Sequence, residues 1–498
     1  MSTRRPGTLV RLIGYFARQR LRLVFAMIML IAGSVIMSFQ PVVFGGAVDD
    51  LAEGDSSGVG RSAAIIIGLA VLSALFSYVS NRELAVLSQR AMESLRNDLF
   101  TSMQTLSLRY YDSQSAGDLD ARITSDIEAI NQFFSAAIAR MIAATMTLGT
   151  MLVIMFTLDP LMTGVVLLVV PMAVVVIGVL GRRVQTDFSA FQQNVGELNG
   201  YVEEVVQGQK TVQAFARQAG SASHVRALSE EARKVDRSSQ FLSYLMQPAV
   251  RLVNNLDIAL IALIGGVRAV NGSITVGQVV SFVGYGQQFG GQMMQLSQVV
   301  SQVGSAVAGG RRVFEVLDAE PDIVDAVDAR SMPAAEGEVA FDHVDFSYTP
   351  DKQILFDNTF HVPAGQTVGL VGPTGAGKST IINLLTRFYD IDDGTITIDG
   401  VDIADIRLDD LRHRCGVVLQ VPFLFSETVM YNLQYGRDGA TRDECVEAAK
   451  QANAHEFIQR LPDGYDTVLE RGESLSQGQR QLLTIARASV ADPDVLVL

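Results

Sequence analysis

The sequence predicts an all-α transmembrane domain followed by an α/β domain. Long runs without charge fill much of the first 305 residues. Charged residues make up only 18% of the chain and the mean hydropathy is +0.26, which indicates several membrane-spanning helices. The second half instead holds a glycine-rich loop between an apolar stretch and a helix-like stretch, an order typical of an α/β fold.

Six segments of the first domain are long and apolar enough to cross a hydrocarbon core of ~30 Å. They cover residues 23–48, 62–81, 141–158, 160–181, 243–268 and 278–305. The third and fourth segments are separated only by a predicted tight turn at Asp159-Pro160. The intervening residues 82–140 and 182–240 carry many charges and predict long helical extensions into the cytoplasm.

The flanking charges predict the orientation of the transmembrane domain. The N-terminal segment, residues 1–22, is rich in arginine, whereas the loop at 49–55 is acidic. By the positive-inside rule the N-terminus is cytoplasmic. Six spans return the chain to the same side, so we expect the second domain to be cytoplasmic too. This places a multi-pass protein in the cell membrane, either an inner or a plasma membrane.

The fifth and sixth spans contain polar side chains, which are costly in lipid and therefore face a bundle interior or a watery cavity. The fifth contains Asn254, Asn255 and Asp257. The glutamines of the sixth are Gln287, Gln288, Gln292, Gln295, Gln298 and Gln302. Asp257 fits a transport pathway and a hydrogen bond between helices equally well. For the later glutamines, a bond between helices or a place beyond the bilayer is favoured, because Gln298 and Gln302 fit the cytoplasmic extension.

Composition excludes other classes of function. The net charge of −14 argues against a nucleic-acid partner, which would favour a basic face. The two cysteines, Cys415 and Cys445, lack the spacing of a metal site. We therefore interpret both as structural thiols.

A phosphate-binding loop organises the second domain. The motif G-x-x-x-x-G-K-[ST] is formed by Gly372, Pro373, Thr374, Gly375, Ala376, Gly377, Lys378 and Ser379, followed by Thr380. We expect an apolar strand at Thr367–Val371 to enter it and a helix at Ser379–Arg387 to leave it. Glycines let backbone N–H groups converge on phosphate oxygens at a helix N-terminus. Lys378 would reach the β- and γ-phosphates, and the Ser379 hydroxyl would bind Mg²⁺.

Other pieces of the second domain, residues 337–498, follow in order after a linker at 306–336. Strands are predicted at Val339–Phe346, with Tyr348 just beyond, at Gly416–Leu419, ending at Gln420, and at Asp494–Leu498. Ser476 fits the N-cap of a helix running to about Val490, whose first amides would point at an anion.

The whole chain resembles an ATP-binding cassette exporter of the fused half-transporter type. The phosphate loop, the glutamine at Gln420 and the segment beginning at Ser476 fall in the order of that family. Residues Tyr111–Arg122 and Glu204–Phe215 resemble its two cytoplasmic coupling segments. The resemblance implies an α/β P-loop nucleotide-binding domain that takes ATP and Mg²⁺.

The same resemblance implies roles for individual residues. Tyr348 would stack on adenine, and Gly372–Thr380 would hold the phosphates. Gln420 would sense Mg²⁺ and the attacking water, which makes it the candidate catalytic residue. Ser476, Gly478 and Gln479 would cap the γ-phosphate of ATP bound to a second half-transporter.

Two departures from the family pattern modify these expectations. Gln477 stands where the family's signature has glycine, and its side chain crowds a backbone that would approach phosphate. Similar variants occur in heterodimeric exporters, so a heterodimer is favoured over a homodimer. The chain also stops before the family's Mg²⁺-binding aspartate and general-base glutamate, which predicts a truncated copy that binds ATP better than it hydrolyses it.

The expected function is ATP-driven export of amphipathic small molecules or lipids through the membrane, by alternating access of a dimer. Two alternatives remain open. One is a peptide or siderophore transporter on the same fold. The other is a membrane-anchored subunit that binds ATP and regulates a partner, which the early end of the chain favours.

Overall fold

The computed structural model describes residues 7–332, 336–470 and 475–498. Small parts of the predicted N-terminal segment and linker therefore lie outside the described residues. The chain divides into two compact units. The first unit comprises Met1–Phe100 and Ala121–Leu317, and the second comprises Thr101–Asp120 and Asp318–Leu498. Helix α13 runs through the first part of the predicted linker, 306–336, up to Leu317.

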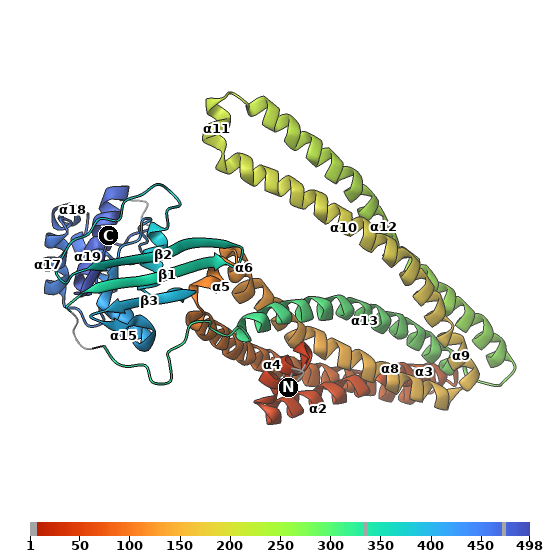
Figure 1. The fold of residues 1–498 in the computed structure, drawn as a ribbon. Helices are drawn as coiled ribbons and strands as arrows, with labels where there is room; N and C mark the ends of the chain where they lie inside the picture. The colour runs from red at the N-terminus through yellow and green to blue at the C-terminus, as the bar shows by residue number, and fades with distance from the viewer. Residues whose placement is uncertain (1–6, 333–335, 471–474) are drawn as a thin grey trace. The chain divides into compact units, whose positions relative to one another are not determined.

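The described part of the first unit is helical, as predicted (Figure 1). Its elements are α1 (Thr8–Ala17), α2 (Arg20–Ser38), α3 (Gln40–Ala52), most of α4 (Ser56–Thr105), η1 (Arg122–Asp126), α7 (Ile127–Gln132), η2 (Phe133–Ala137), α8 (Ile138–Leu158), α9 (Pro160–Leu167), α10 (Val169–Gln207), α11 (Gln209–Ala214), α12 (Gln218–Val270) and α13 (Val276–Leu317). The two charged extensions are helical, and α10 and α12 pack as a long pair joined at α11 (Figure 1).

Four helical stretches of the described chain are long and apolar enough to cross a membrane. They are Arg20–Ala52, Ser56–Thr105, Ala116–Leu158 and Gln218–Val270, and they contain the first, second, third and fifth predicted spans. The predicted fourth span, 160–181, is divided between α9 and α10, and the sixth lies within α13. A total of six spans therefore stays a prediction.

The turn between α8 and α9 forms where Asp159-Pro160 predicts it. A carboxylate oxygen of Asp159 accepts a 2.8 Å hydrogen bond from the backbone N–H of Met162, which makes Asp159 the N-cap of α9. Pro160 occupies the first turn of the helix, where a missing N–H costs nothing. The same oxygen of Asp159 accepts a 2.6 Å bond from Arg268 at the end of α12.

Helices α3 and α13 pack so closely that glycine is required at their contact. A Cβ atom on Gly45 would lie 2.2 Å from the carbonyl oxygen of Gly277. Asp49, on α3, accepts 2.7 Å hydrogen bonds from the Thr275 hydroxyl and the Gly277 N–H, and so caps the start of α13. The N-terminal end of α13 is thereby fixed beside α3.

The second unit contains the last residues of α4, then α5 (Leu108–Asp112) and most of α6 (Ala116–Ala121), and it continues as an α/β fold. Its later elements are β1 (Val339–Thr349), β2 (Lys352–Val362), α14 (Lys378–Leu385), β3 (Asp393–Ile398), β4 (Val401–Asp402), η3 (Ile403–Asp405), α15 (Leu408–Arg414), β5 (Cys415–Val417), α16 (Val429–Gln434), α17 (Arg442–Gln451), α18 (His455–Gln459), η4 (Gly464–Asp466), α19 (Gln477–Val490) and β6 (Val495–Val497). An antiparallel sheet has the order β2-β1-β3-β4, and β5 pairs with β6 in parallel.

Two hydrophobic clusters stabilise the second unit. One lies between the antiparallel sheet and α14 and includes the buried side chains of Phe341, Phe346 and Leu384. The other lies among α16, α17 and α19, with Leu433 and Ala449 fully buried. Burial of such side chains stabilises the folded state by roughly 25 cal/mol for each Å² of apolar surface removed from water. The clusters fix α14 and α19, the two helices whose N-termini were predicted to face phosphate.

The strand predicted at Thr367–Val371 is wrong for this structure. No described residue pairs with this segment as a neighbouring strand, and Val371 is 93% exposed. A strand is stable only where a neighbour takes its hydrogen bonds and one face is buried. The strands predicted around β1, β5 and β6 have such neighbours, and they form.

Candidate nucleotide site and membrane pocket

The phosphate loop has a backbone that only glycine adopts easily. Gly375 and Gly377 have φ angles of +88° and +84°. A Cβ atom on Gly377 would also lie 2.7 Å from the side chain of Leu355. Residues 372–376 are exposed. The loop thus presents its backbone to solvent immediately before the N-terminus of α14, an arrangement that suits phosphate.

Lys378 is the first residue of α14, and its side chain folds back over the loop. The ammonium group donates hydrogen bonds of 2.7 and 2.9 Å to the carbonyl oxygens of Gly372 and Pro373. Ser379, beside it, is exposed. A cation, a hydroxyl and the amides of an exposed loop form a donor set that fits a triphosphate with its metal. Bound Mg²⁺ would neutralise charge on the phosphate oxygens, with Ser379 as the ligand from this loop.

Tyr348 lies against the helix that follows the phosphate loop. Its hydroxyl donates a 3.3 Å hydrogen bond to the Thr380 hydroxyl and accepts a 3.2 Å bond from the Asn383 amide. The ring lies edge-on to Phe346 and Tyr389, with centroids 4.8 and 4.9 Å away. The side chain is half-buried. Stacking of this ring on adenine stays a prediction.

The N-terminus of α19 is capped as the sequence predicts. The Ser476 hydroxyl accepts a hydrogen bond from the Gln479 N–H, and the Gln479 amide oxygen accepts a 2.8 Å bond from the Ser476 N–H. Gln477 and Gly478 are exposed in this first turn. Gln420 is exposed three residues beyond β5. Among the described residues, no hydrogen bond joins Gln420 or this turn to the phosphate loop.

Sequence reasoning missed Tyr389, which is 3% exposed. Its hydroxyl donates a hydrogen bond to the carboxylate of Asp112, at the end of α5. The Arg109 guanidinium lies 5.9 Å from the centre of the Tyr389 ring and 3.3 Å from Asp322. Burial, followed by the bond to Asp112, raises the pKa of the Tyr389 hydroxyl. No periodicity marks this tyrosine, because its partner is 277 residues away.

Both cysteines are buried and free. Burial raises the pKa of the Cys415 thiol to about 12, so this thiol stays protonated and unreactive at neutral pH. This agrees with the structural interpretation of Cys415.

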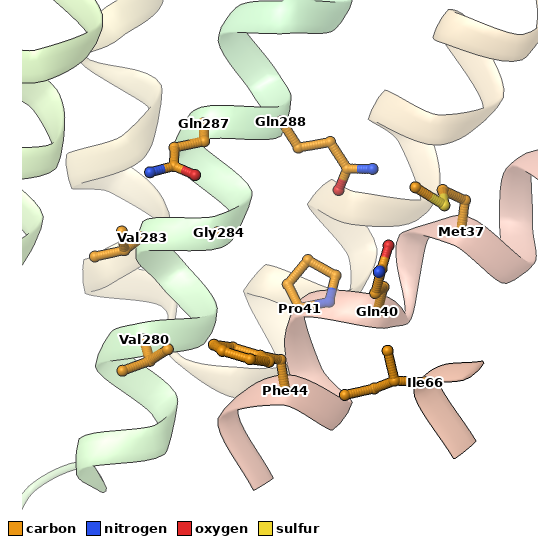
Figure 2. A pocket seen from close by; sticks show the side chains of 10 residues that line it. All are labelled: Met37, Gln40, Pro41, Phe44, Ile66, Val280, Val283, Gly284, Gln287 and Gln288. Atoms are coloured by element: carbon orange, nitrogen blue, oxygen red, sulfur yellow. The ribbon is translucent and has the colours of Figure 1, made fainter. Parts of the chain in front are cut away.

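The first unit contains a pocket of about 590 Å³ between α2, α3, α4 and α13 (Figure 2). It is lined by Met37, Gln40, Pro41, Phe44, Ile66, Val280, Val283, Gly284, Gln287 and Gln288. Most of these groups are apolar and three are neutral amides, which suits a small-molecule site. The amides of Gln287 and Gln288 come from α13, as Figure 2 shows.

The other polar side chains of the predicted spans lie elsewhere. Gln302 accepts a 2.8 Å hydrogen bond from Arg140 of α8, which is a bond between helices, one of the two roles predicted for the later glutamines. Asp257 lies between α12 and α13, in contact with Gly286, and does not line the pocket.

A helical membrane unit followed by a unit with a phosphate loop defines a nucleotide-dependent membrane transporter. Residues 23–293 match the ABC transporter transmembrane region, and residues 355–498 match the ABC transporter family. The chain belongs to the ABC transporters.

Curated relatives cover most of the chain. It is 36% identical over 494 residues to the uncharacterized ABC transporter ATP-binding protein YfiC of Bacillus subtilis, covering 99% of this chain and 82% of the relative. It is 38% identical over 445 residues to the fatty acid ABC transporter ATP-binding/permease protein of Mycobacterium bovis, covering 89% of this chain and 70% of the relative. It is 33% identical to the ATP-dependent lipid A-core flippase of Syntrophus aciditrophicus, covering 85% of this chain and 70% of the relative.

A solved structure of a bacterial Atm1-family ABC exporter with ATP bound has the same fold. The TM-score is 0.77 at 29% sequence identity, over 96% of this chain and 85% of that chain. The predicted order of a helical transmembrane domain and an α/β nucleotide-binding domain is therefore confirmed. The chain is a membrane-spanning exporter of the ATP-hydrolysing type, and it uses ATP.

Proposed function

We propose that the chain is one half of an exporter of amphipathic small molecules or lipids. The observation that carries this proposal is the pocket in the first unit, whose apolar wall is interrupted only by neutral amides. Relatives described as a fatty acid transporter, a lipid A-core flippase and a putative multidrug exporter support it. A mixed apolar and amide lining would bind the apolar part of an amphiphile and satisfy a few polar groups.

The proposed mechanism is alternating access. The N-terminus and the second unit are cytoplasmic, in an inner or plasma membrane, and ATP with Mg²⁺ is held on Gly372–Thr380. Tyr348 contacts the adenine, and Gln420 positions water near the metal. Closure of two nucleotide units on ATP would open the membrane pathway outward. The N-terminal arginines support this orientation.

The partner in this proposal is a second, different half-transporter. Ser476, Gly478 and Gln479 would complete the ATP site of that partner. Gln477 is exposed at the first position of α19, where its side chain reaches the surface that would face phosphate. Two differently tagged copies of this chain, produced together, should therefore not co-purify. Stoichiometric co-purification would support a homodimer instead.

Transport can be tested in inside-out vesicles from the native host's own membrane, which contain the product of the native gene together with its partner half-transporter. We expect a neutral fluorescent amphiphile to accumulate only with ATP, and the Lys378→Ala variant to abolish accumulation. A regulatory subunit would bind ATP without any such movement. A peptide or siderophore transporter would move those compounds and leave the amphiphile outside.

A further inference from the structure

Asp257 is a buried carboxyl group without a partner. It is 3% exposed on α12, and neither of its side-chain oxygens has a hydrogen bond to any residue that the structure describes. One turn earlier on the same helix, the amide oxygen of Asn254 is also buried and unpaired. Three oxygen atoms that accept hydrogen bonds therefore lie close along one helix without a donor. Such groups are costly in a protein interior unless a ligand satisfies them.

The facing helix, α13, leaves space for these two side chains. A Cβ atom on Gly290 would lie 2.6 Å from the Asn254 amide oxygen, and one on Gly286 would lie 3.3 Å from an Asp257 oxygen. The two glycines are one helical turn apart, matching the spacing of the polar pair. The contact between α12 and α13 is thus shaped around Asn254 and Asp257.

The surroundings of this pair are apolar. Val253 and Ile261, one turn on either side of Asp257, are 6% and 0% exposed. They belong to a cluster that includes Phe282 and Phe289 of α13. An ionised carboxylate gains no compensation from such neighbours.

No described charged group faces Asp257 from the helices that pack around it. Helix α9 has no titratable residue, and α10 has none before Arg182. The nearest charged residues of α12 itself are Arg251, which is exposed, and Arg268, which is paired with Asp159. On α13, the buried Tyr285 hydroxyl donates to a backbone carbonyl of α2.

The size of the site limits the ligand. A metal ion such as Ca²⁺ takes six to eight oxygen ligands, and the apolar neighbours supply none. A cavity of about 20 Å³ borders Asn254 and Gly290, which is room for about one water molecule. A proton needs only one carboxyl oxygen, and it neutralises Asp257 and turns that oxygen into a donor.

We propose that Asp257 is a proton-binding site at the contact of α12 and α13. The proton is bound while the helices are packed as in this structure, and it exchanges when they separate. Proton binding is independent of the function proposed above. Exchange during the transport cycle rests on that function.

Infrared spectroscopy of the purified full-length protein tests proton binding directly. We expect a protonated carboxyl band at neutral pH that shifts when aspartate is labelled with ¹³C and disappears in Asp257→Asn. The matched control is Asp55→Asn, which removes an exposed aspartate and should leave the band unchanged. A spectrum without such a band, or a band that survives Asp257→Asn, would overturn the proposal.

A second variant keeps the test valid if Asp257→Asn does not fold. Gly286→Ala retains the carboxyl group but places a methyl group against it. We expect this change to displace the same band, whereas Gly291→Ala, in open space on α13, should not. Equal spectra for the two glycine variants would contradict the assignment to Asp257.

Exchange during transport needs a separate measurement. In vesicles with a pH-sensitive dye inside, ATP-driven transport by the wild-type protein should move protons, and transport by Asp257→Asn should not. If the infrared band is present but no proton moves, the site binds a proton without exchanging it, and the second part of the proposal fails. If the wild-type protein does not transport the amphiphile at all, that result would instead count against the proposed function alone.

Discussion

The hydroxyl group of Tyr389 donates a hydrogen bond to the carboxylate of Asp112. The centre of the Tyr389 ring lies 4.9 Å from that of Tyr348, and the Tyr348 hydroxyl donates a hydrogen bond to Thr380, the residue after the phosphate-loop motif. Asp112 belongs to the segment that resembles the first coupling segment of the family. Two tyrosines therefore connect the phosphate loop with that segment inside the second unit.

Replacing Tyr389 by phenylalanine should loosen the segment 101–120 without weakening ATP binding. The ring stays in place, but Asp112 loses its donor, and a hydrogen bond to a charged group contributes about 1.5–3 kcal/mol. We expect faster hydrogen–deuterium exchange at 108–118 and an ATP affinity within about twofold of the wild type, a difference below 0.5 kcal/mol.

The control is Tyr435→Phe, because Tyr435 is 57% exposed at the C-terminal end of α16. It should leave exchange at 108–118 unchanged. Unaltered exchange in Tyr389→Phe would mean that the hydrogen bond does not hold the segment.

Local sequence patterns predicted much of this structure because their causes are local. The capping pair Ser476 and Gln479 is three residues apart, and the glycines of the phosphate loop are required by the backbone of the loop itself. The bond between Tyr389 and Asp112 could not be predicted, since it joins distant parts of the chain. The strand expected at Thr367–Val371 failed for a related reason: apolar residues favour a strand, but only a neighbouring strand completes it.

The sequence could not decide whether Asp257 lines a transport pathway or forms a hydrogen bond between helices, because the answer depends on distant residues. Its position in a predicted span indicated that the carboxyl group would face a bundle interior or a watery cavity. Only the structure shows that Gly286 lies opposite and that no described donor reaches either oxygen.

Replacing Lys378 by alanine should weaken ATP binding at least about tenfold, or about 1.4 kcal/mol. The ammonium group now bonds to the carbonyl oxygens of Gly372 and Pro373, so it is already close to the loop that would hold phosphate. Titration with a fluorescent ATP analogue measures the change. Lys352→Ala, at an exposed lysine on β2, is the control for a lost positive charge and should bind ATP normally. Equal affinities for both variants would disprove the role of Lys378.

The free energy of unfolding should depend on pH in the acid range because of Glu444, a carboxylate in the first turn of α17. Hydrogen bonds from Thr441, with a further contribution from Arg437, lower the pKa of Glu444 from 4.5 to about 2. A lowered pKa in the folded state adds stability that is present above pH 4.5 and lost as the pH falls toward 2.

Glu444→Gln keeps a side chain suited to the capping box but cannot titrate. Its melting temperature should therefore fall less than that of the wild type between these two pH values. Parallel curves for the two proteins would show that Glu444 does not contribute.

The ion pair of Asp159 and Arg268 can be separated from the helix cap by two substitutions at one position. Asp159→Asn keeps an oxygen that can accept from the Met162 N–H but removes the charge that pairs with Arg268. Asp159→Ala removes both. The cap alone contributes about 1 kcal/mol, and a hydrogen bond between charged groups about 1.5–3 kcal/mol. We expect thermal unfolding of the detergent-solubilised protein at a lower temperature for Asp159→Asn, and lower still for Asp159→Ala.

The variant Arg268→Met should unfold at a lower temperature than the double variant Arg268→Met with Asp159→Asn. The single change leaves the Asp159 carboxylate, which is 9% exposed, without its cation. If the double variant melts lower than Arg268→Met, the pair acts through packing rather than charge.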